Sequence, residues 1–491
     1  MCIICNENSL ISKRGISVDR KQYEILALTF RYWFVLLIMI IFVQCTIRTI
    51  RDVFTNRKVM RSSGNIPFLL VLFSLTAFGL LATQSSQGFD FDTAILGVLV
   101  SAVILFQFYV FYYLFHGMDE VIVLIVDTLA ILGFVMLQRL TPELAIRQIE
   151  WFVIGNVFLF IIMLVLPKLR HPGRFVFPLM ILGPLTLFIV ALFGQESGGA
   201  TSLLGIGPIT IQPAEFVKLI FIIVMSYYLD EKKTFRERIP AFLFVMTSIL
   251  GVVAQKDLGG ALLYFLVFLF MYQISTSDWL ITIFTAGAGV LAAVFSYRIF
   301  PHVQVRVEAW KNPWADIGGK GWQVAQALIA MGSGGLLGLG LGLGTPYVIP
   351  ASRTDFIFAA ICEEFGIIVG GMIIGFYVLI VLRSMKKAYE ANEPADMLLA
   401  SGSAISIGIQ SFIIIGGVIK MIPLTGITLP FISYGGSSMV VSLSTLALIQ
   451  SVSIKNQRFA KKMGIDDEYE ESELYYNEDE NKDNYNVDEE V

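Results

Sequence analysis

Residues that commonly bind metal ions are scarce in this sequence. Its 491 residues include four cysteines and three histidines. Cys2 and Cys5 form a CxxC pair, but no second pair accompanies them to complete the ligand set of a structural zinc site. We therefore expect no metal–thiolate site.

Charge is scarce as well. Charged residues make up 15% of the chain and hydrophobic residues 56%, and the mean hydropathy is +0.73. Soluble domains carry about 25% charged residues, so this composition excludes that class and predicts an integral membrane protein. The first residues also lack the basic stretch, apolar core and cleavage site of a signal peptide. We expect the first apolar run to direct insertion.

Long apolar runs are abundant. Thirteen of them can cross a hydrocarbon core of about 30 Å, and the run at 240–254 is the shortest. The fold class they predict is an all-α polytopic membrane protein. The runs lie near 31–49, 66–83, 92–115, 120–137, 149–166, 173–194, 211–229, 240–254, 258–275, 278–299, 355–383, 397–419 and 431–452.

Basic residues collect after the first, fifth, seventh and eleventh runs, and so on one side of the membrane. Short cytoplasmic loops retain Lys and Arg. We therefore predict an outside amino terminus, an inside carboxy terminus and an outside connection at 300–353. The basic clusters are Arg48, Arg51, Arg57, Lys58 and Arg61; Lys168, Arg170 and Arg174; Lys232, Lys233, Arg236 and Arg238; and Arg383, Lys386 and Lys387.

The end of the chain is acidic. From Asp466 onward there are thirteen acidic residues against Lys482 alone. Such a run of like charge with few apolar residues is predicted to be disordered in the cytoplasm. It is either a solvated tail or a docking segment for a cytoplasmic partner.

The connection at 300–353 is the longest between the apolar runs, and its tryptophans argue against disorder. Function is therefore expected outside the membrane. Asp316 lies between aromatic residues and precedes the sequence IGGKG. Apolar surroundings raise the pKa of a carboxyl group and glycines let a bulky ligand approach, a combination that suits a general base. The alternative is an aspartate that caps its own turn.

Four cations surround Asp316 in the sequence. They could neutralise the phosphates of a substrate, or they could be solvated loop charges. The glycine run at 332–344 lacks the preceding strand of a nucleotide-binding fold, so we expect no nucleotide there, but close backbone packing on a re-entrant segment. The four cations are Arg306, Lys311, Lys320 and Arg353.

Charged residues within apolar runs usually have a function. Glu215 and Lys218 are three residues apart on one predicted helical face, where they can pair. They either form an ion pair between helices or contact a substrate head group. Asp257 begins another run, near the predicted outer boundary.

The stretch PLTGITLPFISYGGSS at 423–438 breaks the helical pattern before the last run. Broken backbone can expose amide groups toward an outward-facing cavity, and a helix start is a favourable site for an anion. We therefore predict Ser433, Gly435 and Gly436 as binding residues. The alternative is tight helix packing through small residues.

Five motifs in this order resemble the SEDS family of shape, elongation, division and sporulation proteins, over 119–454. They are IQPAEFVKL, KDLGGALL, DIGGKGWQVAQALIAMGSGGLLGLGLG, RTDFIFAAICEEFG and PLTGITLPFISYGGSS. Thr425 stands where division-type members commonly carry Lys, and this departure suggests the elongation and sporulation branches. Ser202 and Leu203 stand where the family often carries Arg and Trp.

The resemblance implies a ten-helix core at 116–455 with the outer loop 300–353. Three extra spans at 31–115 and a short outer segment at 1–30 precede it, and a cytoplasmic tail at 456–491 follows.

The function that the resemblance implies is a peptidoglycan glycosyltransferase. Such an enzyme polymerises lipid II on the outer face of the bacterial membrane, in complex with a class B penicillin-binding protein and with no nucleic-acid partner. Whether the enzyme also needs a divalent cation, Mg or Mn, to bridge the phosphates is not decided by the sequence. The alternatives are a flippase for the lipid-linked precursor and a scaffold that activates a partner synthase. The predicted catalytic residue is Asp316, and the predicted substrate-binding residues are Arg306, Lys320, Arg353, Glu215, Lys218, Ser433, Gly435 and Gly436.

Overall fold

A computed structural model describes 20–55, 64–84, 88–169, 173–197, 199–206, 209–229 and 235–463. The Cys2–Cys5 pair and the acidic tail from Asp466 lie outside the described residues, as do parts of the basic clusters.

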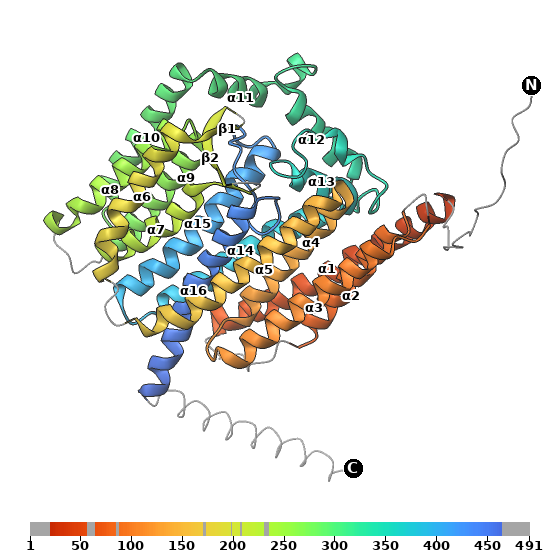
Figure 1. The fold of residues 1–491 in the computed structure, drawn as a ribbon, viewed down its shortest axis with the longest axis horizontal. Coiled ribbons are helices and arrows are strands. Elements are labelled where there is room, and N and C mark those ends of the chain that lie inside the picture. The colour runs from red at the N-terminus through yellow and green to blue at the C-terminus, as the bar shows by residue number, and fades with distance from the viewer. Residues whose placement is uncertain are drawn as a thin grey trace, which may run out of the picture.

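A helix forms at every predicted apolar run (Figure 1). Within the described ranges, eleven helices are long and apolar enough to span a membrane, while α2 and α7 have 17 and 16 residues. The all-α polytopic prediction is confirmed. The helices are α1 Arg20–Thr55, α2 Ile66–Ala82, α3 Phe91–Leu114, α4 Glu120–Leu140, α5 Pro142–Val165, α6 Gly173–Phe193, α7 Pro213–Tyr228, α8 Phe235–Ala254, α9 Leu258–Thr276, α10 Trp279–Ile299, α14 Ile367–Tyr389, α15 Pro394–Val418 and α16 Gly436–Lys462.

Aspartates begin four of these helices. Asp90, Asp119, Asp257 and Asp278 are the N-caps of α3, α4, α9 and α10, and each carboxylate accepts a hydrogen bond from a backbone amide of the first turn. Capping satisfies amides that have no partner within the helix. These positions therefore fix where the chain turns back into the apolar layer.

The predicted run at 355–383 is not one helix, and that prediction is wrong. It divides into α13 Ile357–Phe365 and α14 at Gly366, whose φ is +90°. A Cβ atom at Gly366 would lie 2.3 Å from the carbonyl oxygen of Leu336. The close passage of the preceding loop, together with a backbone conformation that favours glycine, ends the first helix.

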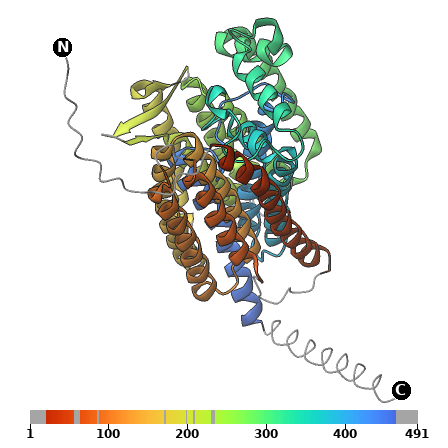
Figure 2. The same cartoon turned by 90° about the vertical axis from the view of Figure 1, so that its right-hand side faces the viewer.

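Burial distinguishes the centre of the bundle from its edge. The apolar windows of α4 and α16 are almost entirely buried, whereas that of α10 contains no buried residue. Helices α1, α2 and α3 lie against one side of the core, with α1 along α14 and both α2 and α3 along α4. Figure 2 shows this three-helix unit facing the viewer. Helix α1 begins at Arg20, inside the predicted outer segment 1–30, because Tyr23 and Ala27 are buried on its inner face.

The connection at 300–353 is folded, as predicted, and we call it the outer connection after the side predicted for it. It contains α11 Pro301–Lys311, the 3-10 turn η2 Pro313–Asp316, α12 Trp322–Gly334 and the 3-10 turn η3 Pro346–Val348. Figure 1 shows α11 and α12 covering one end of the bundle.

A small antiparallel sheet joins α6 to α7 and was not predicted. Its strands are β1 Gln195–Ser197, β2 Ala200–Ile206 and β3 Ile209–Ile211, in the order β1-β2-β3. Strands β2 and β3 pair with Leu204 opposite Ile211 and Ile206 opposite Ile209. The strands are too short for a hydrophobic periodicity to reveal them.

Helix α3 is held to α4 by a buried polar pair. Gln107 Nε2 donates to Asp127 Oδ1 at 3.1 Å, and both side chains are buried. Replacing Asp127 with Leu leaves this amide without its acceptor, and we expect the free energy of unfolding to fall by about 1–3 kcal/mol. Asp127→Asn retains an acceptor oxygen and should cost much less. Thermal unfolding in detergent measures both, and equal losses would contradict this account.

Candidate functional site

The segment at 419–435, between α15 and α16, is not helical, and side chains from neighbouring helices bind its backbone. Gln410 Nε2 of α15 donates to the carbonyl oxygen of Thr428 at 2.9 Å. The hydroxyl of Tyr377 in α14 donates to the carbonyl of Pro430. Buried backbone groups must be paired within the protein, and residues 429–433 of this segment are buried. These side chains therefore stabilise the break between the last two helices.

Helix α5 binds the same segment at its far end. Gln148 Nε2 donates to the carbonyl oxygen of Ser433 at 3.0 Å, and the amide of Gly435 donates back to Gln148 Oε1 at 3.1 Å. A Cβ atom at Gly436 would lie 2.4 Å from the indole nitrogen of Trp151. Gly436 thus packs closely against α5, and Gly435 binds α5 through its amide.

Ser433 joins this segment to the end of the outer loop. Its buried hydroxyl accepts a hydrogen bond from the amide of Leu429 at 3.0 Å and donates to the carbonyl oxygen of Thr354 at 2.7 Å. The amide of Tyr434 donates to the carbonyl oxygen of Arg353 at 2.9 Å. The loop at 351–355 is therefore fixed against the break, and we call this loop the Arg353 loop.

A group of charged residues lies on one side of these two loops. Arg306 Nη1 of α11 donates to the carbonyl oxygen of Thr425 at 2.6 Å. A Cβ atom at Gly426, where φ is +80°, would lie 3.1 Å from Arg306 Nη2 and 3.6 Å from Asp355 Oδ2. Burial raises the pKa of Asp355 and that of Asp257, and Arg306 opposes both shifts.

The pairing predicted for Glu215 and Lys218 is present. Lys218 Nζ lies 2.7 Å from Glu215 Oε2 and 2.7 Å from Gln410 Oε1. Because Gln410 also binds Thr428, this ion pair connects α7 through α15 to the helix break. The ion pair itself lies within α7, and the hydrogen bond from Lys218 to Gln410 joins it to α15.

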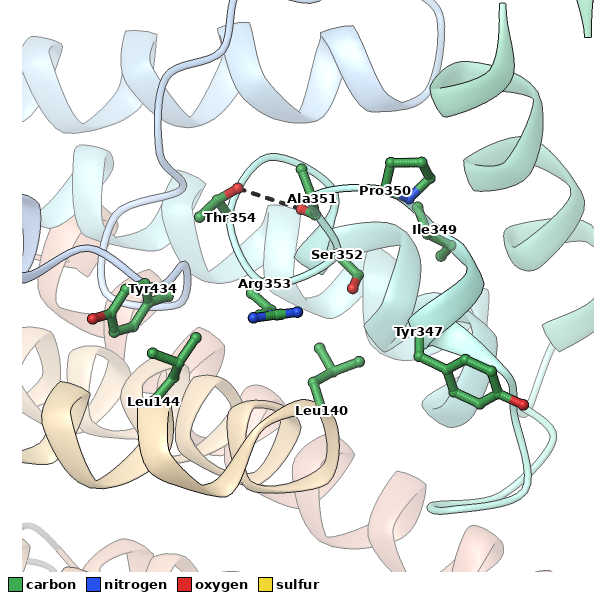
Figure 3. A pocket seen from close by; sticks show the side chains of 10 residues that line it. All are labelled: Leu140, Leu144, Tyr347, Ile349, Pro350, Ala351, Ser352, Arg353, Thr354 and Tyr434. Carbon is green, nitrogen blue, oxygen red and sulfur yellow. Dashed lines mark hydrogen bonds between the residues drawn. The ribbon is translucent and has the colours of Figure 1, made fainter. Parts of the chain in front are cut away.

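A cavity of about 460 Å³ is lined by residues of the Arg353 loop (Figure 3). Among the described residues that line it, Arg353 is the charged one, and it is exposed. Leu140 and Leu144, from the α4–α5 corner, form an apolar wall, and Tyr347 and Tyr434 lie at the sides. The cavity thus combines one cation with apolar surface.

Asp316 lies in a turn on the exposed side of the outer connection. Its carboxylate accepts the amide of Lys320 at 3.0 Å, and its carbonyl oxygen accepts the amides of Gly319 and Gly321. The prediction that Asp316 is pressed against apolar surface is wrong, because its aromatic neighbours are themselves partly exposed. The turn-capping role is present, and the carboxylate remains accessible.

Lys320 is engaged with another carboxylate. Its Nζ lies 2.8 Å from Glu308 Oε2, and this hydrogen bond raises the pKa of Lys320. Of the predicted substrate-binding cations, Lys320 and Lys218 therefore have carboxylate partners, Arg306 binds a carbonyl group, and Arg353 faces the cavity.

The predicted binding residues at the helix break have protein partners instead of an open cavity. The hydroxyl of Ser433 and the amide of Gly435 both form hydrogen bonds within the fold. Gln148, Gln410 and Asp355 were not predicted as residues of the site. The two glutamines could have been found, because isolated polar residues among apolar ones usually have a function.

The residues of the site can be checked for a set of side chains that could bind a metal ion. Among the residues that the structure describes, no group of three or more His, Cys, Asp or Glu is arranged to hold an ion. These residues do not fit a resident Mg or Mn site.

Comparison with known proteins identifies relatives of the whole core. The family model described as "Cell cycle protein" (FtsW, RodA, SpoVE) matches 108–458. Peptidoglycan glycosyltransferase RodA of Mycobacterium tuberculosis H37Rv is 32% identical over 370 residues, which is 68% of this chain and 78% of that protein. Stage V sporulation protein E of Bacillus subtilis 168 is 34% identical over 287 residues, covering 55% and 75%.

Solved structures share the fold. A chain from a peptidoglycan synthase complex that coordinates polymerization and crosslinking aligns with a TM-score of 0.59 and 26% identity, over 69% of this chain and 98% of its own. Rod shape determining protein RodA of Thermus thermophilus aligns with a TM-score of 0.52 and 27% identity, over 68% and 96%.

Gly426 provides a test of this site geometry. Alanine there adopts a left-handed conformation and crowds Arg306, so we expect Gly426→Ala to lower the free energy of unfolding by about 1–2 kcal/mol. Gly332→Ala is the matched control, because Gly332 lies in α12 and a Cβ atom there meets nothing within 4 Å. Thermal unfolding distinguishes them, and a Gly426→Ala protein as stable as the native chain would refute the geometry.

Proposed function

The chain belongs to the FtsW, RodA and SpoVE family of cell cycle proteins, and from this premise we propose that it polymerises lipid II on the outer face of a bacterial membrane. It is a multi-pass membrane protein and a peptidoglycan glycosyltransferase. One observation supports the proposed site most strongly. The Arg353 loop and the helix break are fixed to each other beside a cavity that Arg353 lines, and the exposed Asp316 belongs to the same outer connection.

In the proposed reaction, Asp316 takes the proton from the 4-hydroxyl group of one lipid-linked disaccharide. The hydroxyl oxygen then bonds to the anomeric carbon of the growing chain, and the bond from that carbon to undecaprenyl pyrophosphate breaks with inversion. The bonding electron pair leaves with the diphosphate. Because a diphosphate departs without protonation, one carboxylate is sufficient.

Positive charge near the departing diphosphate stabilises the transition state. Arg353 is the strongest candidate, because its side chain lines the cavity while Lys320 is paired with Glu308. The apolar wall of Leu140 and Leu144 suits the first units of a polyprenyl chain beside the diphosphate. Since no fitting donor set is present among the described residues, we derive no step through a divalent cation.

The remaining predicted residues receive a supporting role in this proposal. Arg306 holds the carbonyl of Thr425, and the Glu215–Lys218 pair holds Gln410. Ser433, Gly435 and Gly436 fix the helix break. These residues would set the site's shape without contacting the substrate.

A class B penicillin-binding protein is the proposed partner, since a relative of known structure belongs to a peptidoglycan synthase complex. We also propose that the outer connection faces outside and the carboxy terminus faces the cytoplasm. Buried ion pairs join Asp52 of α1, Asp119 of α4 and Arg383 of α14 at one end of the bundle. Two of the predicted cytoplasmic basic clusters thus meet at one end.

Asp316→Asn tests the chemistry. If Asp316 is the general base, purified protein with this change should lose about 10²–10⁴-fold in the rate of glycan formation from lipid II, with and without the partner. Glu196→Gln, which neutralises an exposed carboxylate in the small sheet, is the matched control and should retain the native rate. Full activity of Asp316→Asn would refute the assignment.

Topology can be measured separately. With a reporter that is active only in the cytoplasm fused after Lys462, we expect signal from intact cells, and with the same reporter inserted in the 312–321 turn we expect none. The opposite pattern would contradict the proposed orientation.

A further inference from the structure

The three-helix unit α1–α3 lies outside the ten-helix core, yet its outer end contacts one segment of the outer connection. We call residues 335–344 the glycine-rich loop. We propose that α1 and α2 position this loop and, through α13, the Arg353 loop, so that Tyr23 and Arg31 are positioning residues for the transfer reaction. The catalytic part of this inference rests on the proposed function.

Side chains of the three-helix unit bind carbonyl groups of the glycine-rich loop. The buried hydroxyl of Tyr23 donates to the carbonyl oxygen of Leu341 at 2.9 Å. Arg31 Nη1 donates to the carbonyl oxygen of Gly338 at 3.1 Å. Gln84, just after α2, donates through Nε2 to the carbonyl oxygen of Gly342 at 3.2 Å.

The shape of the loop matches α1 closely. Gly342 has a φ of +86°, and a Cβ atom there would lie 1.9 Å from the hydroxyl oxygen of Tyr23. At Gly340, where φ is +110°, a Cβ atom would lie 3.1 Å from the carbonyl oxygen of Ala27. Glycine at these positions lets the loop backbone lie directly on the helix.

The opposite side of the glycine-rich loop binds α13. The amides of Leu339 and Gly340 donate to the carbonyl oxygens of Glu363 and Glu364 at 2.9 and 3.0 Å. The amide of Gly342 also donates to Glu364 Oε2 at 3.1 Å. The loop is therefore held between α1 on one side and α13 on the other.

Helix α13 links the glycine-rich loop to the Arg353 loop, which lines the cavity. The Arg353 loop directly precedes it, and Phe356 is its N-cap residue. At its other end, the ring of Phe365 lies between α1 and α2, with centroids 5.9 Å from Phe34 and 6.4 Å from Phe73. A shift of the three-helix unit would therefore displace α13 and, with it, Arg353.

The three-helix unit has separate anchors, so removing the loop contacts should leave it in place. At the opposite end of α1, Asp52 Oδ1 lies 2.7 Å from Lys386 Nζ, and Asp52 Oδ2 lies 3.2 Å from Arg383 Nη2. Phe42 of α1 packs edge-on against Phe376 of α14 at 5.2 Å. Substitution of Tyr23 and Arg31 should consequently loosen the glycine-rich loop without detaching the helices.

The experiment uses the full chain in detergent or nanodiscs with the double substitution Tyr23→Phe and Arg31→Ala. Hydrogen exchange of backbone amides at 338–345 should become about tenfold faster or more, since local opening is easier. Polymerisation of lipid II should fall several-fold at an unchanged melting temperature, and a Tyr23→Phe chain with Arg31→Lys should regain part of it. Thr29→Ala is the matched control, because the Thr29 hydroxyl donates to the carbonyl oxygen of Ile25 in its own helix.

Unchanged exchange at 338–345 would overturn the inference, as would faster exchange with native polymerisation. Hydrogen exchange does not depend on catalysis. A native chain that makes no glycan would therefore count against the proposed function. The exchange rates separately test whether α1 positions the glycine-rich loop.

Discussion

Unpaired backbone in an apolar layer is costly, and the break at 419–435 between α15 and α16 is built around that constraint. Side chains from α5, α11, α14 and α15 donate hydrogen bonds to its carbonyl groups. The hydroxyl of Ser433 bonds it to the outer connection through Thr354. The polar residues inside otherwise apolar helices follow from this need. Gln148 and Gln410 each bind a carbonyl of the break, and the Glu215–Lys218 pair in turn supports Gln410.

The same constraint explains how the site is assembled. The Arg353 loop gains its position from Ser433 and from Tyr434, so the cavity exists only while the break keeps its shape. The glycine-rich loop approaches from the other direction and is fixed by α13 and by α1. Segments far apart in sequence thus meet at one end of the bundle, and each is held by hydrogen bonds to backbone.

Much of the fold could be predicted from hydropathy, because spans of about twenty apolar residues leave few alternatives. The Glu215–Lys218 pair was predictable from its three-residue spacing on a helix, and its distance of 2.7 Å confirms it. The division at Gly366 was not, because it depends on the passage of Leu336 against the helix start. The surroundings of Asp316 were predicted wrongly, because aromatic neighbours in sequence need not cover a side chain in space. The contacts of Ser433 depend on Thr354, which lies far away in the chain, and no local pattern reveals them.

We propose that this chain joins lipid-linked disaccharides at the end of the bundle that bears the outer connection. The most direct measurement reconstitutes the native protein in vesicles containing lipid II and records glycan strands and movement of lipid II between leaflets in the same sample. Glycan strands should form on the face that bears the outer connection, and lipid II should cross no faster than in protein-free vesicles. Rapid crossing of lipid II without strand formation, even with the partner synthase present, would contradict the proposed reaction.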